Sequence, residues 1–175
     1  GKGELETRCA GLKPLEPVET GRDDAAMVAF TSGTTGVPKG CIQFHRDVLA
    51  PCDAFARAHF RMESGDIVMT SAPIAFTFGL GATLMFPLYF GAAAATIEQP
   101  SPPAMLDAMA QHGVTHLATA PTAYKAMLSQ PALTDALKSL KCCLSAGEHL
   151  PSATWAAWKA HTGIAIVDGI GSTEM

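Results

Sequence analysis

Residues 31–40 carry the most distinctive chemistry of the sequence. They read Thr31-Ser32-Gly33-Thr34-Thr35-Gly36-Val37-Pro38-Lys39-Gly40. Glycines allow the backbone to adopt positive φ and to approach a ligand closely, so that several backbone N–H groups can point at one anion. The hydroxyls add hydrogen-bond donors that rotate to suit, and Lys39 adds a positive charge. This composition predicts a loop that binds a polyphosphate.

The spacing of the loop differs from that of a Walker A motif. Counting from Gly33, Pro38 stands where that motif has its second glycine, and Gly40 stands where it has Ser or Thr. The hydroxyl that usually binds magnesium is therefore missing, and the metal must be held from elsewhere. The alternative is an ordinary surface loop rich in Gly, Ser and Thr. A lysine in the same loop, directly after a predicted strand, favours the phosphate-binding interpretation.

Residues 32–40 resemble, almost residue for residue, the phosphate-loop signature of the adenylate-forming superfamily. This superfamily includes acyl-CoA synthetases, adenylation domains and luciferases. The resemblance implies that the chain binds ATP and that Lys39 is catalytic. The ATP-binding residues implied for this loop are Thr31, Ser32, Gly33, Thr34, Thr35, Gly36 and Lys39.

A later stretch, Asp168-Gly169-Ile170-Gly171-Ser172-Thr173-Glu174, resembles the second signature of the same superfamily. By this resemblance Thr173 is catalytic and contacts phosphate, while Glu174 is catalytic and helps to hold Mg²⁺, an ion that prefers carboxylate and phosphate oxygens. Asp168 and Gly169 are expected at the nucleotide, near the adenine. Ile170 replaces the aromatic residue that commonly stacks on the base. The alternative is a turn in which Glu174 is merely exposed.

The segment Ser145–Pro151 resembles the loop beside the adenine in this superfamily, which implies nucleotide contacts from Gly147 and Glu148. The alternative is that Glu148 caps the helix that follows.

The apolar segment Ala75–Leu80 falls where the superfamily places its acyl-substrate motif. Phe76, Phe78 and Gly79 suit a flat apolar acid, and the aspartate that amino-acid-activating relatives usually carry here is missing. The segment is most similar to that of benzoate- and 2-aminobenzoate-CoA ligases. The alternative is that Phe76 and Phe78 simply pack in the core.

The chemistry implied is electrostatic, because no local pattern suggests a Ser/His/Asp triad or a zinc site. A carboxylate attacks the α-phosphate of ATP to give an acyl-adenylate and pyrophosphate, and the CoA thiol then takes the acyl group. The expected cofactors are ATP, Mg²⁺ and CoA as co-substrate. The alternatives are a nucleotide-binding module without catalysis and an acyl-CoA synthetase for a non-aromatic acid.

Strands and helices alternate along the chain, which predicts an α/β domain with a mainly parallel sheet flanked by helices. The expected strands are 27–31, 41–44, 67–70, 93–97, 115–118, 142–145 and 164–167. The expected helices are 45–60 (with a start or kink at Pro51), 76–88, 101–112, 121–128, 133–140 and 152–161. Ser101 and Ser152 are expected to cap the helices that they begin, and Trp155 and Trp158 to pack on the sheet. Residues 27–31 are apolar and are expected to be buried. Every candidate site segment except 75–80 follows a predicted strand, and ligands in such sheets bind beyond the carboxyl ends of strands.

Composition narrows the class of protein. The 175 residues are 48% hydrophobic and only 16% charged, and a net charge of −4 argues against a nucleic-acid partner. Residues 71–97 contain no charged side chain, and this uncharged run is long enough to span a membrane. The prolines and glycines inside this run favour a helix, a turn and a strand instead.

Five cysteines without metal spacing, and no signal peptide, favour reduced thiols and a cytoplasmic location.

The resemblance covers about Met27 to Met175, which is the middle of such an enzyme. Residues 1–24 are expected to be a linker or terminal edge, and residues 25–175 a partial AMP-binding domain. The C-terminal domain of the same chain, whose lysine these enzymes use for adenylation, is expected to be a missing partner. The piece alone is therefore expected to be inactive or nearly so.

Overall fold

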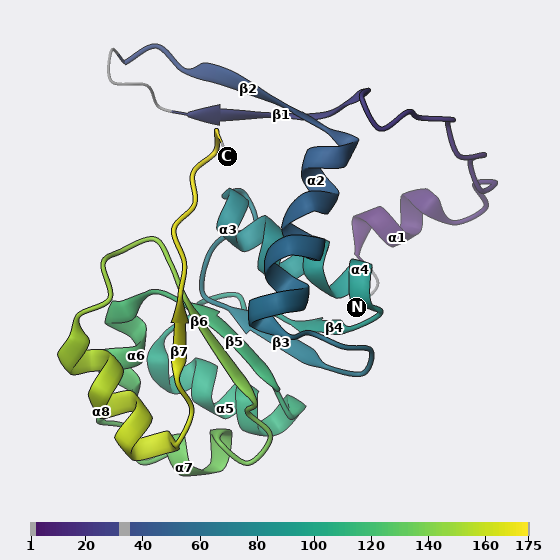
Figure 1. The fold of residues 1–175 in the computed structure, drawn as a ribbon. Helices are drawn as coiled ribbons and strands as arrows, with labels where there is room; N and C mark the ends of the chain where they lie inside the picture. The colour runs from purple at the N-terminus through teal and green to yellow at the C-terminus, as the bar shows by residue number, and fades with distance from the viewer. Residues whose placement is uncertain (1–2, 32–35, 175) are drawn as a thin grey trace.

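A five-stranded parallel sheet forms the centre of the molecule (Figure 1). The structure, a computed structural model, describes residues 3–31 and 36–174. The strand order is β4-β3-β5-β6-β7, and every pairing between neighbours is parallel. The strands are β3 (Ile67–Thr70), β4 (Ala93–Ala95), β5 (His116–Thr119), β6 (Cys142–Ser145) and β7 (Ile166–Asp168). The predicted α/β class and parallel sheet are confirmed.

Helical segments cover both faces of this sheet (Figure 1). One face carries α5 (Pro102–His112), α6 (Pro121–Met127), α7 (Leu133–Ala136) and α8 (Ser152–Thr162). The other carries α2 (His45–Pro51), α3 (Thr77–Leu80), α4 (Phe86–Phe90) and two π-helical segments, η1 (Cys52–Phe60) and η2 (Gly81–Met85). Side chains alternate between the faces along a strand. Leu117 and Cys143 accordingly belong to the first apolar core, while Ala118 and Leu144 belong to the second.

The first core is fixed by Tyr124 and Trp158, whose rings meet edge to face with centroids 4.7 Å apart. Both side chains are fully buried. The Tyr124 hydroxyl lies 2.9 Å from the carbonyl oxygens of Leu117 and Leu144, and so ties β5 to β6. The prediction that the aromatic residues of α8 pack on the sheet is confirmed for Trp158.

The first two strands form an antiparallel hairpin, β1 (Ala25–Thr31) and β2 (Lys39–Phe44), outside the parallel sheet. Residues 27–31 form a strand as predicted, but the prediction that this strand is buried is wrong, since Val28 is 51% and Phe30 70% exposed. Within the described residues these strands pair only with each other, and the exposed side chains of Val28, Phe30 and Ile42 mark an uncovered face of the ribbon. The phosphate loop therefore connects two antiparallel strands. The sequence instead predicts that it follows a strand of the parallel sheet.

The sequence predicts a helix over 45–60 with Ala56 and His59 on one face and a start or kink at Pro51. The hydrogen-bonding pattern does change there, since the α-helix α2 gives way to the π-helix η1 directly after Pro51. Proline cannot donate the next helical hydrogen bond, and i→i+5 bonding turns the buried face relative to an α-helix. Phe60 is therefore buried, whereas His59 is exposed.

The apolar run of residues 71–97 folds as three short helical segments, α3, η2 and α4, followed by β4. Gly91 ends α4 in the left-handed conformation, with φ +68°. Within residues 3–31 and 36–174, no helix is both long and apolar enough to cross a membrane.

Two predicted helix starts have different outcomes. Ser101 caps α5 as predicted, since its side chain accepts a hydrogen bond from the Ala104 N–H at 3.4 Å. The prediction that Ser152 caps α8 is wrong, because Pro151 occupies the cap position and Ser152 is already helical.

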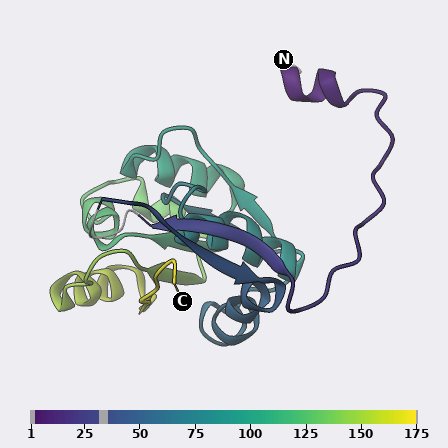
Figure 2. The same ribbon diagram turned by 90° about the horizontal axis from the view of Figure 1, so that it is seen from above.

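The N-terminal segment before β1 extends away from the rest of the molecule (Figure 2). It contains one short helix, α1 (Glu4–Cys9), which the aperiodic sequence of residues 1–24 does not predict. No helix or strand is formed between α1 and β1.

Candidate active site

A cavity of about 410 Å³ opens at the carboxyl edge of the parallel sheet. Segments far apart in the sequence line it. They include the base of the hairpin, α2 and η1, the helical run 77–86, the end of β6, and the segment that follows β7. The carboxyl edge is where ligands bind in sheets of this kind. The cavity is therefore the candidate active site.

The walls of the cavity are mostly apolar, with Phe55, Phe78 and Met85 among the lining side chains. Gly79 explains how the backbone beside Phe78 comes so close to the preceding loop. A Cβ at this position would collide with the carbonyl group of Pro73. Of the aromatic pair predicted to bind substrate, Phe78 lines the cavity, whereas Phe76 is 66% exposed and lies outside the lining.

The second signature continues directly from β7 into the cavity wall. Asp168 is exposed at the end of β7, in register with Ser145 of β6. The Gly169 N–H donates to the Ser145 carbonyl at 2.8 Å, which extends the strand pairing by one residue. Gly169 and Thr173 line the cavity, as does Ile170. Glu174 is exposed and lies outside the lining.

One polar contact joins this segment to the hairpin. The Gln43 side-chain amide of β2 donates to the Thr173 carbonyl at 2.9 Å, and both residues line the cavity. No local motif in the sequence marks Gln43, because its partner lies 130 residues away.

The phosphate loop is described only at its ends. Ser32, Gly33, Thr34 and Thr35 lie outside the described residues. Thr31 and Lys39 stand opposite each other in the β1–β2 register, and Lys39 is exposed. Gly36 has φ +79°, a conformation that favours glycine. Thr31, Gly36 and Lys39 lie outside the cavity lining.

The predicted adenine-side loop contributes one residue to the cavity. Gly147 lines it and has φ +86°. The Glu148 carboxylate accepts a hydrogen bond from the Thr122 hydroxyl of α6 at 3.2 Å. Glu148 therefore contacts α6, and its nucleotide contact stays a prediction.

The acidic side chains of the described residues indicate where Mg²⁺ could bind. Within the part of the chain that the structure describes, no three His, Cys, Asp or Glu residues group together as a metal site. Mg²⁺ is often held by one or two carboxylates together with substrate phosphates. The exposed carboxylate of Glu174 fits such a shared site.

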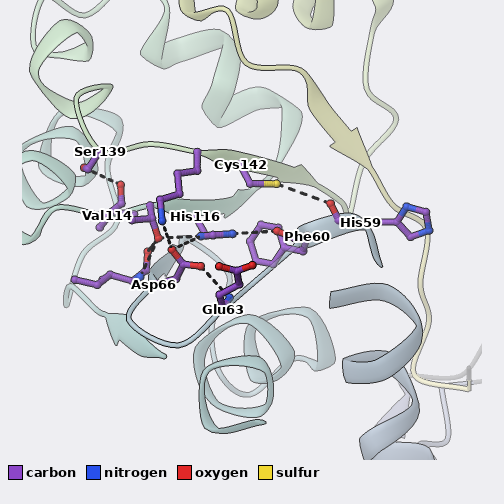
Figure 3. A network of polar contacts seen from close by, with 11 residues as sticks. His59, Phe60, Glu63, Asp66, Val114, His116, Ser139 and Cys142 are labelled. Atoms are coloured by element: carbon purple, nitrogen blue, oxygen red, sulfur yellow. Dashed lines mark hydrogen bonds and ion pairs between the residues drawn. The ribbon is translucent and has the colours of Figure 1, made fainter. Parts of the chain in front are cut away.

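A second cavity, of about 610 Å³, lies at the opposite, amino-terminal edge of the sheet. Its polar centre is shown in Figure 3. The buried carboxylate of Asp66 accepts hydrogen bonds from Lys141 Nζ at 2.8 Å and from the Glu63 N–H at 2.9 Å. These contacts hold the pKa of Asp66 below its usual value although burial by itself raises it.

His116 completes this centre. Its Nε2 donates to the Phe60 carbonyl at 3.0 Å, and its Nδ1 lies 2.8 Å from the Thr115 hydroxyl. Burial lowers the pKa of His116, while the nearby Asp66 carboxylate partly offsets the effect. Asp66 and His116 thus already have partners within the protein, which indicates a structural role in joining the ends of η1, β3, β5 and β6.

Comparison with known proteins assigns the chain to a family. The sequence model of the family described as "AMP-binding enzyme" matches residues 2–175. The benzoate–CoA ligase of Thauera aromatica is 38% identical over 170 residues, which is 94% of this chain and 32% of that enzyme. The chain therefore spans about a third of the length of this relative.

Solved structures share the fold of this chain. The anthranilate CoA ligase AuaEII in complex with anthranoyl-AMP matches with a TM-score of 0.83 and 35% identity, over 92% of this chain and 32% of that one. ATP-bound MatB from Rhodopseudomonas palustris matches with a TM-score of 0.86 and 28% identity, over 99% of this chain and 34% of that one. With the family model matching nearly the whole sequence, the chain belongs to the family of AMP-binding enzymes.

Proposed function

We propose that this chain is part of a cytoplasmic, ATP-dependent aryl-CoA ligase that activates an acid of the benzoate or 2-aminobenzoate type. The observation that carries the proposal is the shared cavity. Phe78, from the predicted substrate segment, and Gly169 and Thr173, from the second signature, line the same apolar space. Benzoate- and anthranilate-CoA ligases among the relatives support an aromatic substrate.

The charge of the cavity also favours a flat apolar ring. Among the residues that the structure describes, Asp47 is the one charged residue that lines it. Its carboxylate accepts a hydrogen bond from the Phe44 N–H at 3.0 Å and lies 3.5 Å from the Arg46 guanidinium. Because Asp47 is already paired within its own turn, the cavity offers the ring of the acid a mainly apolar surface.

The nucleotide would occupy the open side of this cavity. We assign its phosphates to the loop 31–36, Lys39 and Thr173, and its adenosine to Gly147, Glu148, Asp168 and Gly169. The acid carboxylate attacks the α-phosphorus, a new acyl–phosphate bond forms, and pyrophosphate leaves. Lys39 and the loop donors stabilise the negative charge that develops on the phosphate oxygens. The CoA thiol then attacks the acyl carbon, and AMP leaves.

Magnesium would be held by Glu174 together with phosphate oxygens. When bound, it supplies positive charge that neutralises those oxygens. The activity is proposed for the full-length protein, because the chain spans about a third of its relatives. The rest of the protein would supply the groups that complete the reaction, including the C-terminal domain.

The test is release of pyrophosphate by the full-length protein with Mg²⁺-ATP and a panel of benzoates, aminobenzoates and fatty acids. Release that depends on an aromatic acid, and falls at least tenfold in a Lys39→Ala variant, is the expected result. Release with fatty acids alone would contradict the aromatic assignment. ATP binding without release, whatever the acid, would favour a nucleotide-binding module instead.

A further inference from the structure

We propose that Gln43 is a positioning residue that holds the second signature at the correct distance from the phosphate-binding hairpin. Its amide donates to the Thr173 carbonyl at 2.9 Å, across 130 residues of sequence. The proposal rests on the proposed function, because positioning matters only if the two signatures act on one nucleotide.

The segment after β7 has few other ties to the protein. Pairing with β6 ends at the hydrogen bond from the Gly169 N–H to the Ser145 carbonyl. Beyond it, the Glu174 N–H donates to the nearby Ser172 hydroxyl. Within the described part of the chain, the bond from Gln43 is the one hydrogen bond that joins residues 170–174 to another element.

Gln43 lies near the end of β2 that leads into α2. It is half-buried in β2 and stands opposite Met27 in the hairpin register. Residues four apart on a strand point to the same face, so Lys39 and Gln43 share one face of the hairpin, separated by about 13 Å along the strand. The outer face carries Ile42, which is 57% exposed.

The consequence is geometric. One strand carries both the catalytic cation at one end and the amide that holds Thr173 at the other. If the amide is lost, residues 170–174 can move relative to the hairpin, and the hydroxyl and carboxylate of Thr173 and Glu174 no longer meet the phosphates at a fixed distance. Because the acid binds elsewhere in the cavity, misplacement of Thr173 and Glu174 slows the chemical step more than it weakens binding of the acid.

The experiment compares three variants of the full-length protein. Gln43→Glu keeps the side-chain shape but replaces the donor with a charged acceptor that repels the carbonyl. Gln43→His keeps an N–H donor of similar reach. Gln111→Glu makes the same chemical change at an exposed position of α5, outside the cavity lining, and is the matched control.

We expect kcat for pyrophosphate release to fall at least tenfold in Gln43→Glu, with KM for the acid changing less than threefold. Gln43→His should stay within threefold of the parent, and Gln111→Glu should match it. Equal losses in the Glu and His variants, or a kcat within twofold of the parent in Gln43→Glu, would overturn the proposal.

A second readout does not depend on activity. Backbone order parameters of residues 170–174, from NMR relaxation, should be lower in Gln43→Glu than in the parent and unchanged in Gln111→Glu. Unchanged order parameters in Gln43→Glu would overturn the positioning role even if the enzyme is active. Lower order parameters in a protein that releases no pyrophosphate with any acid would leave the contact established and the proposed function refuted.

Discussion

Phe76 and Phe78 lie two residues apart, yet the structure gives them different environments. Phe78 lines the cavity, whereas Phe76 is 66% exposed. We expect Phe78→Ala in the full-length protein to lower kcat/KM for an aromatic acid roughly tenfold, which is about 1.4 kcal/mol of lost contact. Phe76→Ala is the matched control and should stay within twofold. Equal losses measured by pyrophosphate release would show that the cavity does not hold the ring.

His116 predicts a dependence of stability on pH. Burial lowers its pKa in the folded protein below the ordinary value of 6.5. As pH falls through 6.5, the unfolded chain binds a proton that the folded chain does not, so the free energy of unfolding falls until the pH passes the folded-state pKa. Asp66, whose pKa is also lowered, acts in the same direction only at more acidic pH.

The measurement is urea unfolding of the full-length protein between pH 7.5 and 5. We expect a weaker dependence on pH in His116→Gln, because the amide can still donate to the Phe60 carbonyl but does not titrate in this range. His161→Gln, at an exposed position of α8, should retain the dependence of the parent. Identical slopes in the parent and in His116→Gln would contradict this assignment.

At the scale of elements, the two serines at helix starts give a sharp comparison. Ser101 caps α5 with its side chain, whereas Ser152 makes no such bond at α8. Ser101→Ala should lower the free energy of unfolding by about 1 kcal/mol. Ser152→Ala should change it by less than about 0.5 kcal/mol. The comparison uses chemical denaturation of both variants, and a larger loss at Ser152 would contradict the observed caps.

The sequence predicted the parallel strands and the clearly amphipathic helices because their signals are local. Ser101, a stretch of apolar periodicity and Gly113 sufficed for α5, and β6 has the predicted bounds. The π-helical segments were missed, because the change of hydrogen-bonding pattern at Pro51 depends on how the segment packs on the sheet. The hairpin was misjudged as buried, because apolar residues in a strand do not reveal which faces other layers cover.

At the scale of the whole molecule, the motifs were found but their assembly was not predictable. The second signature and the substrate segment each have a local pattern, and the structure brings Phe78 and Thr173 to one cavity. Gln43 has no local pattern, because its importance arises only from its contact with Thr173. Predicted positions such as Phe76 and Glu148 lie outside the cavity lining for the same reason: residue type does not fix the direction of a side chain.

The central claim is that this chain contributes to adenylation of an aromatic acid, and its most direct test is exchange of labelled pyrophosphate into ATP by the full-length protein. Exchange requires reversible formation of the acyl-adenylate, and it does not require CoA. We predict exchange that depends on benzoate or 2-aminobenzoate and falls at least tenfold in the Lys39→Ala variant. ATP binding without acid-dependent exchange would contradict the claim.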